Sequence, residues 1–145
     1  MKTAVILAAR KERDTTIPYP LQCYNVGEKK QESMLHRTVS LLQEMEFETI
    51  IVVTGFCAEL FAPFKGKGVQ LVNNGRYVYT SSMASLALAA PYVKEDFLLI
   101  ESDVLCEKRL LKQLATTSKK NCLTLVNECG NGDEALVETD GDFVV

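Results

Sequence analysis

The chain has 145 residues, with 16 Lys and Arg against 19 Asp and Glu, so its formal net charge is −3. A hydrophobic content of 47% and a charged content of 24% are typical of a folded globular domain and exclude a disordered chain. The acidic balance argues against a general nucleic-acid or anionic-membrane binder, and no apolar run approaches the roughly 20 residues that span a bilayer. We therefore expect a cytoplasmic protein with one domain over residues 1–145.

The cysteine and histidine content excludes the usual zinc sites. None of the five cysteines lies in a CxxC pair, and His36 is the single histidine of the sequence. We expect reduced thiols that mostly pack in the core, with Cys23 non-catalytic. His36 falls at a polar helix position, which favours a surface residue over a catalytic one. The phenylalanines at 56, 61 and 64 are expected in the core rather than under a nucleotide base.

The first half of the chain alternates between buried strands and helical periodicity. An almost wholly apolar run over residues 2–8 predicts a buried strand, and a long polar connection without secondary structure, with two prolines and Gly27, is predicted over residues 9–32. A connection of that length is usually functional. Ser33 offers an N-cap, and apolar residues at helical spacing predict a helix to residue 46. Residues 49–54 predict the next buried strand, which ends at Gly55.

The alternation continues through the second half. We predict a short helix over 58–64, strands over 69–72, 97–100 and 122–126, and helices over 82–90 and 107–117. Turn sequences at 130–133 and 140–142 then lie between short strands. Strand–helix alternation with short links predicts a Rossmann-like, doubly wound α/β fold with a mostly parallel sheet and helices on both faces. The apolar ending at 142–145 favours an N-terminal part of a longer protein.

Three segments fall at the carboxyl ends of the predicted strands, where such sheets bind ligands. The first loop carries Arg10, Lys11 and Arg13, which could hold a polyphosphate or form a solvated charged surface. Asp103 follows the fourth strand and could bind Mg²⁺ or cap the next helix. A polar run over 77–86, with several hydroxyl side chains, opens the helix after the third strand and, taken alone, is a serine-rich N-cap.

Taken in order, these motifs resemble the nucleotidyltransferases of the sugar-phosphate and phosphocholine cytidylyltransferase type, from residue 4 to about 126. Leu-Ala-Ala at 7–9 resembles the family's opening strand, and Pro18, Pro20 and Leu21 resemble its Pro-Lys-Pro-Leu stretch. Residues 51–56 resemble its Val-Thr-Gly-Tyr strand end, and 97–104 its Mg²⁺-binding strand end. The chain also resembles the cytidylyltransferase branch of the family, in a pattern made of Asn74, Tyr77, Thr80, Ser85 and Leu86.

The first loop departs from that family pattern. Arg10 and Glu12 stand at the positions of its two loop glycines, and Asp14 stands at that of its arginine. Tyr19 replaces the lysine of Pro-Lys-Pro-Leu. The basic side chains of the loop would then replace backbone donors to the phosphates. No counterpart of the family's second metal-binding aspartate is evident.

The resemblance implies a fold of the nucleotide-diphospho-sugar transferase type and attack of an acceptor phosphate on the α-phosphorus of a nucleoside triphosphate, releasing pyrophosphate. It favours CTP as donor, a small phosphorylated alcohol, phosphonate or sugar phosphate as acceptor, and Mg²⁺ as cofactor. It implies that Asp103 holds the metal and that Lys11 and Arg13 act on the triphosphate. The nucleotide-binding residues would be Leu7, Ala8, Ala9, Arg10, Thr54, Gly55, Ser82 and Ser85.

Two other interpretations stay open. The glycine-less loop and the lost lysine favour a degenerate domain that binds a nucleotide, or nothing, and regulates an attached enzyme. An unrelated Rossmann-like redox module is less favoured, because no GxGxxG follows any predicted strand and no acidic residue ends the second one. An exposed sheet edge would also allow a homodimer.

Overall fold

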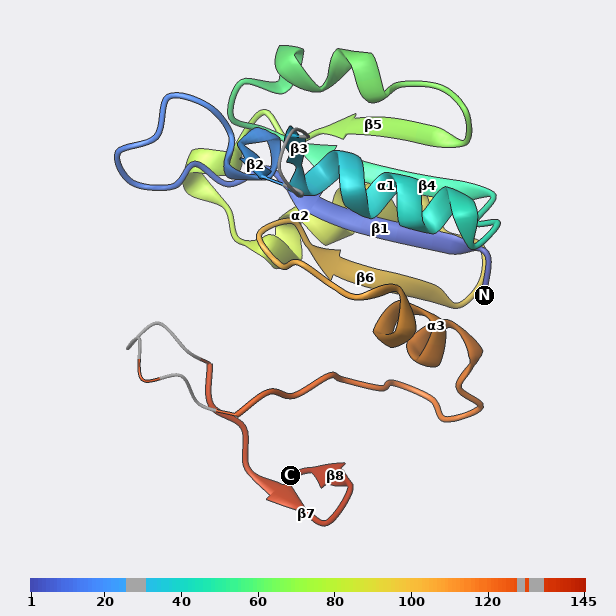
Figure 1. Ribbon diagram of the computed structural model, residues 1–145. Helices are drawn as coiled ribbons and strands as arrows, with labels where there is room; N and C mark the ends of the chain where they lie inside the picture. Colours follow the sequence, from blue (N-terminus) through green and yellow to red (C-terminus); the bar gives the residue numbers. More distant parts are fainter. Residues whose placement is uncertain (26–30, 128–129, 131–134) are drawn as a thin grey trace.

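A parallel four-stranded sheet forms the centre of the computed structural model, which describes residues 1–25, 31–127, 130 and 135–145 (Figure 1). β1 (Thr3–Ala8) pairs with β4 (Thr49–Thr54) on one side and with β6 (Phe97–Glu101) on the other. β5 (Val69–Asn73) pairs with the outer side of β4. The order β5-β4-β1-β6 therefore reverses direction at β1, which makes the gap between β1 and β6 the expected ligand-binding position of a doubly wound sheet.

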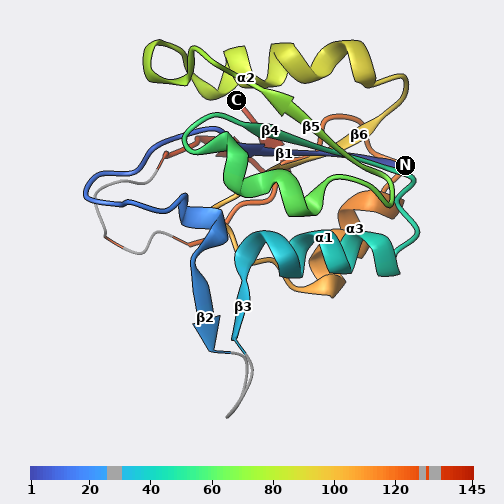
Figure 2. The same ribbon diagram turned by 90° about the horizontal axis from the view of Figure 1, so that it is seen from above.

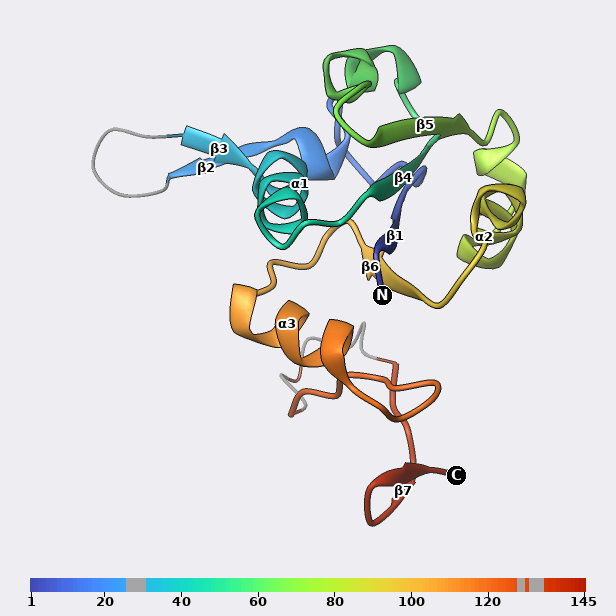
Figure 3. The ribbon, with the colours of Figure 1, turned by 90° about the vertical axis from the view of Figure 1, so that its right-hand side faces the viewer.

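Helices cover both faces of the sheet, as predicted (Figures 2 and 3). Alternate β1 residues belong to different cores, because successive strand side chains point to opposite faces. Ile6 packs in a core with α1 (Met34–Glu44), the 3₁₀ helix η2 (Ala58–Phe64) and α3 (Lys108–Thr116). Val5 packs in the other core with α2 (Ser82–Ala89). Reversal of the strand order, combined with right-handed crossovers, requires this change of face between β5 and β6.

An N-cap hydrogen bond explains where α1 begins, and a residue with left-handed backbone explains where it ends. The Ser33 side chain accepts a hydrogen bond from the His36 backbone N–H at 3.2 Å, which is the predicted N-cap. The apolar stripe that includes Leu35 and Leu42 is buried against the sheet. Glu46 lies in the left-handed region, with a φ of 60°, so the helix ends before it, at Glu44 rather than at the predicted residue 46.

The prediction of a structureless connection over 9–32 is wrong in its second half. A 3₁₀ turn, η1 (Tyr19–Leu21), contacts α1, and β2 (Cys23–Asn25) pairs antiparallel with β3 (Gln31–Ser33). Glu32 is buried opposite Tyr24, so tertiary packing supplies the order that the polar sequence does not indicate. The predicted turn glycine, Gly27, lies outside the described residues. Figure 2 shows the hairpin projecting beside the start of α1.

The predicted strand over 122–126 is absent from the structure. These residues form no ladder and are exposed, with Val126 84% exposed. An apolar run becomes a strand only where a sheet edge pairs with it, and after α3 the chain doubles back on the side of that helix away from β6 (Figures 1 and 3). The predicted turn at 140–142 is confirmed, because β7 (Thr139–Asp140) pairs with β8 (Phe143–Val144). Of the turn at 130–133, residues 131–133 lie outside the described residues.

The expectation that the cysteines mostly pack in the core is wrong for Cys23 and Cys122, whereas Cys106 packs against the core. Cys23 and Cys122 are exposed, Cys57 and Cys106 are partly exposed, and all four are free thiols. Cys23 begins β2, Cys57 and Cys106 precede η2 and α3, and Cys122 lies outside any helix or strand. Cys129 is outside the described residues. No helix in the described part of the chain is long and apolar enough to cross a membrane.

Candidate functional site

The loop after β1 is held against the end of β4. Leu7, Ala8 and Ala9 are buried, and the Ala9 carbonyl accepts a hydrogen bond from the Phe56 N–H at 3.0 Å. Gly55 makes this approach possible, because a Cβ built on it would lie 2.6 Å from the Ala9 carbonyl oxygen. The loop therefore starts from a rigid point, and the side chains from Arg10 onward project beyond it.

Two of the three basic side chains in this loop have partners. The Arg10 guanidinium lies 3.2 Å from the Glu12 carboxylate, and the Lys11 ammonium lies 5.1 Å from the centre of the Phe56 ring. Such a cation–π contact contributes about 0.5–1 kcal/mol at an exposed site. Arg13 is exposed and has no ion pair within the described residues. The loop thus offers one unpaired cation and two cations held by weak surface contacts.

An aromatic pair borders the loop, and sequence reasoning missed it. The Phe56 and Tyr77 ring centroids lie 6.4 Å apart with their planes inclined by 53°. The expectation that Phe56 joins the core is therefore wrong, although Phe61 is fully buried and Phe64 packs against the same core. Phe56 follows the turn at Gly55, so the helical spacing that places the other two does not extend to it. The sequence signal that could have indicated the position of Phe56 was the Val-Thr-Gly-Phe strand end, which places this aromatic residue directly after the turn.

Carboxylates end β6 on the other side of the reversal point. Asp103 is exposed, and the Ser102 N–H donates to the Leu7 carbonyl at 3.2 Å, which ties this loop to the end of β1. Partial burial and the nearby Asp103 charge raise the pKa of Glu101, while Arg10 partly offsets the rise. The two carboxylates and Arg10 therefore share one electrostatic environment. Glu101 was not among the predicted site residues.

The carboxylates of Glu101 and Asp103 suit a divalent cation whose remaining ligands come from the substrate and from water. Within the described residues, no three His, Cys, Asp or Glu side chains gather as a metal cage. Mg²⁺ is usually held by one or two carboxylates together with substrate phosphates and water. Burial and then the Asp103 charge raise the pKa of Glu101, and Arg10 offsets only part of that rise, so a cation at this place would be favoured.

The third segment is organised by Asn74 rather than by its serines. Asn74 is buried, and its amide Nδ2 donates to Thr80 Oγ1 and to Ser85 Oγ, each at 3.0 Å. Its Oδ1 accepts from the Arg76 N–H, also at 3.0 Å. Ser85 is therefore buried and engaged inside the protein, while Ser82 is exposed at the start of α2. The Asn74 bonds hold the loop that carries Tyr77.

The structure also places two other residues that the sequence analysis singled out, Thr54 and His36. Thr54 is buried at the end of β4, where its hydroxyl lies 3.5 Å from the Val72 carbonyl. The His36 side chain is 60% exposed and pairs with Glu32 at 2.9 Å, which confirms the surface assignment. The structure thus brings the β1 loop, the β4 turn and the β6 loop to one edge of the sheet.

Comparison with known proteins identifies related domains. The pattern of the MobA-like NTP transferase domain matches residues 24–137, a range that begins after the β1 loop. The chain is similar to the CTP:phosphocholine cytidylyltransferase LicC of Streptococcus pneumoniae, at 25% identity and a TM-score of 0.58, over 71% of this chain and 46% of that one. It shares its fold with Rv0371c of Mycobacterium tuberculosis H37Rv, at 20% identity and a TM-score of 0.56, over 78% and 58% of the two chains. The chain therefore spans about half the length of these two proteins.

Proposed function

Because the chain belongs to the family of MobA-like NTP transferase domains, we propose that it forms the nucleotide-binding part of a nucleotidyltransferase. The proposed reaction transfers CMP from CTP to a small phosphorylated alcohol, phosphonate or sugar phosphate. The observation that carries this proposal is the meeting of a cationic loop and a carboxylate pair where the strand order reverses.

Each group has a role that follows from its charge. Lys11 and Arg13 would bind the triphosphate, with Arg10 beside them, since guanidinium and ammonium groups neutralise phosphate oxygens. Asp103, joined by Glu101, would hold Mg²⁺, which when bound neutralises charge on the triphosphate. The nucleotide would lie over the strand ends formed by Leu7, Ala8, Ala9, Thr54 and Gly55 and against the exposed Ser82. Ser85, buried in its hydrogen bond with Asn74, would support that surface from within.

The reaction itself needs positioning and charge neutralisation more than covalent chemistry from the protein. An acceptor phosphate oxygen attacks the α-phosphorus of CTP, a new phosphoanhydride bond forms, and the bond to the leaving pyrophosphate breaks. Lys11 and Arg13 would stabilise the charge that develops on the departing pyrophosphate. Because the loop starts from a rigid point at Ala9, the positions of Lys11 and Arg13 relative to the sheet would be fixed.

Similarity to a CTP:phosphocholine cytidylyltransferase supports CTP as the donor and a small amino-alcohol phosphate among the acceptors. Calorimetric titration of this chain with CTP, UTP, dTTP, ATP and GTP, with and without Mg²⁺, tests the donor. We expect saturable, Mg²⁺-dependent binding of CTP alone. Equal binding of all five nucleotides would overturn the CTP preference.

A paired variant tests the cationic loop. Replacing Lys11 and Arg13 by alanine should abolish CTP binding, whereas Lys112→Ala, which removes an exposed cation on α3, should leave it unchanged. Unchanged CTP affinity in the double variant would refute the assigned roles.

A second candidate function is a degenerate domain that binds nucleotide without catalysis. The Arg10–Glu12 ion pair favours it, because it occupies a loop position where the resembling transferases have glycine. The family match, which begins after this loop, also favours it. Under this alternative, Asp103→Ala in the complete protein leaves its function intact. Loss of activity with retained folding would refute it.

A further inference from the structure

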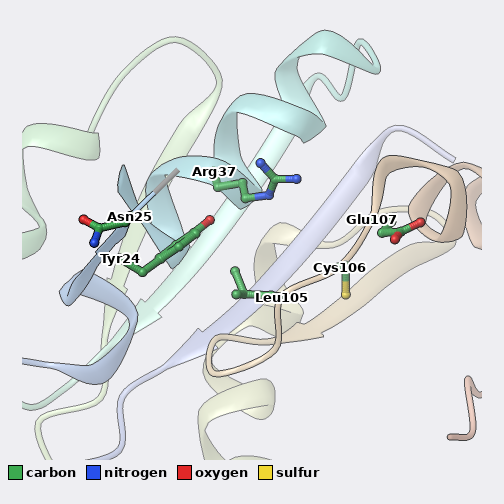
Figure 4. Close-up of a pocket in the computed structure, with 6 residues that line it drawn as sticks. All are labelled: Tyr24, Asn25, Arg37, Leu105, Cys106 and Glu107. Carbon is green, nitrogen blue, oxygen red and sulfur yellow. The ribbon is translucent and has the colours of Figure 1, made fainter. Parts of the chain in front are cut away.

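A cavity lies on the α1–α3 side of the same sheet edge, and the proposed nucleotide-binding residues do not line it. Its volume is about 300 Å³, and it is lined by Tyr24, Asn25, Arg37, Leu105, Cys106 and Glu107 (Figure 4). Three separate parts of the chain therefore form its walls: the β2–β3 hairpin, α1, and the loop from β6 to α3. A volume of this size is at the lower end of the range for small-molecule sites.

Two hydrogen-bond donors at this cavity have no acceptor among the residues that the structure describes. The Tyr24 hydroxyl oxygen is buried, and no described residue forms a hydrogen bond with it. Arg37 makes no ion pair or side-chain hydrogen bond within the described residues, although its guanidinium carries five N–H donors. In Figure 4 the Tyr24 ring extends from β2 toward Arg37. Leaving a buried hydroxyl unpaired costs about 1–3 kcal/mol, so an acceptor at this place would be stabilised.

The remaining walls fit an apolar group beside that acceptor. Leu105 and Cys106 lie below Arg37 in Figure 4, and burial raises the pKa of the Cys106 thiol, which keeps it neutral. Glu107 lies beyond Cys106 on the side away from Tyr24, and the Asn25 amide points away from the cavity (Figure 4). The negative carboxylate is thus at the opposite end of the cavity from the Tyr24 hydroxyl (Figure 4).

We propose that this cavity is a second ligand site, which binds a small organic anion. Arg37 and Tyr24 hold its phosphate or carboxylate group, and its hydrocarbon part lies on Leu105 and Cys106. The site goes beyond the proposed nucleotidyl transfer, because none of these residues belongs to the β1 loop or to the carboxylate pair. It shares only the β6–α3 loop with that site, so a bound anion would also brace the segment that carries Asp103.

Titration with phenyl phosphate, without nucleotide, tests the proposal. Binding is followed by backbone amide shifts in ¹⁵N-correlated NMR spectra, and we expect saturating shifts at Tyr24, Arg37 and Leu105. Benzoate tests whether a carboxylate serves as well as a phosphate, and binding of either anion supports the site. Benzyl alcohol lacks the charge and should cause no saturating shift. Equal binding of benzyl alcohol, or no binding of either anion at millimolar concentration, would overturn the proposal.

Matched variants assign the binding to the two donors. Arg37→Gln should weaken phenyl phosphate binding by about tenfold or more, because a charge-assisted bidentate contact is lost. Tyr24→Phe should weaken it by about three- to tenfold, through one hydrogen bond to a charged group. Arg109→Gln removes the same charge from an exposed position of α3 and should change nothing. Equal affinities of the Arg37 and Arg109 variants would refute the assignment.

A competition experiment separates this site from the proposed nucleotide site. Phenyl phosphate shifts should persist in the Lys11 and Arg13 double variant, whether or not that variant binds CTP. Displacement of phenyl phosphate by CTP would show one site instead of two and overturn the proposal. Failure of CTP to bind at all would count against the proposed function and leave the anion site standing.

Discussion

Gly55 holds together the two segments that form the candidate nucleotide site, so Gly55→Ala is the sharpest test of its geometry. A Cβ at this position would lie 2.6 Å from the Ala9 carbonyl oxygen, and 2.8 Å and 2.9 Å from the Cβ and Cγ atoms of Tyr77. One of these contacts is backbone and cannot be relieved by rotating a side chain. Either the β1 loop or the aromatic pair must shift.

The expected loss of stability in Gly55→Ala follows from overpacking, because the added methyl group enters a region that is already well packed. Inserting one methyl group there destabilises a fold by about 1–3 kcal/mol. In a domain of this size that corresponds to a fall in melting temperature of roughly 3–10 °C. Thermal unfolding followed by circular dichroism measures the change, and calorimetry measures the accompanying loss of CTP affinity.

Gly75→Ala is the matched control for the same substitution. No atom lies within 4 Å of a Cβ built on Gly75, and its φ is not in the left-handed region. It should alter stability by no more than about 0.5 kcal/mol. Equal melting temperatures for the two variants would refute the conclusion that Gly55 is required for the close approach of these segments.

Three further changes test other parts of the structure. Asn74→Ala should destabilise the domain by about 2–4 kcal/mol in urea unfolding, because it removes a buried side chain with three hydrogen bonds, whereas Asn73→Ala, at an exposed position, should change stability little. Glu101→Gln should raise stability at neutral pH, by less than about 1 kcal/mol because the group is solvated. Since the folded pKa of Glu101 is raised, this gain should vanish as pH falls below the ordinary Glu value, and a gain that persists at low pH would contradict it. Phe61→Ala should cost about 3–5 kcal/mol by the same unfolding assay, because this fully buried side chain anchors η2, and a cost below 1 kcal/mol would show that η2 is not held by it.

The sheet could be predicted from the sequence because its strands are covered on both faces. β1 and β4 contain almost wholly apolar runs, and a strand buried between two layers needs no polar face. The carboxyl ends of β1 and β6 also identified where Arg10, Lys11 and Asp103 would lie. A parallel sheet brings these ends to one edge whatever the detailed packing.

Contacts between distant side chains could not be predicted in this way. Phe56 and Tyr77 meet because Gly55 lets one turn approach another. The pKa of Glu101 is raised by burial and by Asp103 on its own loop, and lowered by Arg10 from the loop after β1. The exposed run over 122–126 shows that an apolar, strand-like sequence is not enough to predict a strand. Its residues have strand-forming character, but pairing depends on a partner edge that local sequence does not encode.

The sequence by itself determined the layered α/β fold and the edge of the sheet where chemistry is expected, since both depend on apolar periodicity and the handedness of strand connections. Tertiary structure alone decided which side chains are engaged. Ser85 is buried in the Asn74 network, and Lys11 lies over an aromatic ring. Arg37 and the Tyr24 hydroxyl lie beside a cavity without an acceptor in the described part of the chain. Hydrogen bonds and burial depend on distances of a few tenths of an ångström between segments far apart in the chain, and only the packed fold sets those distances.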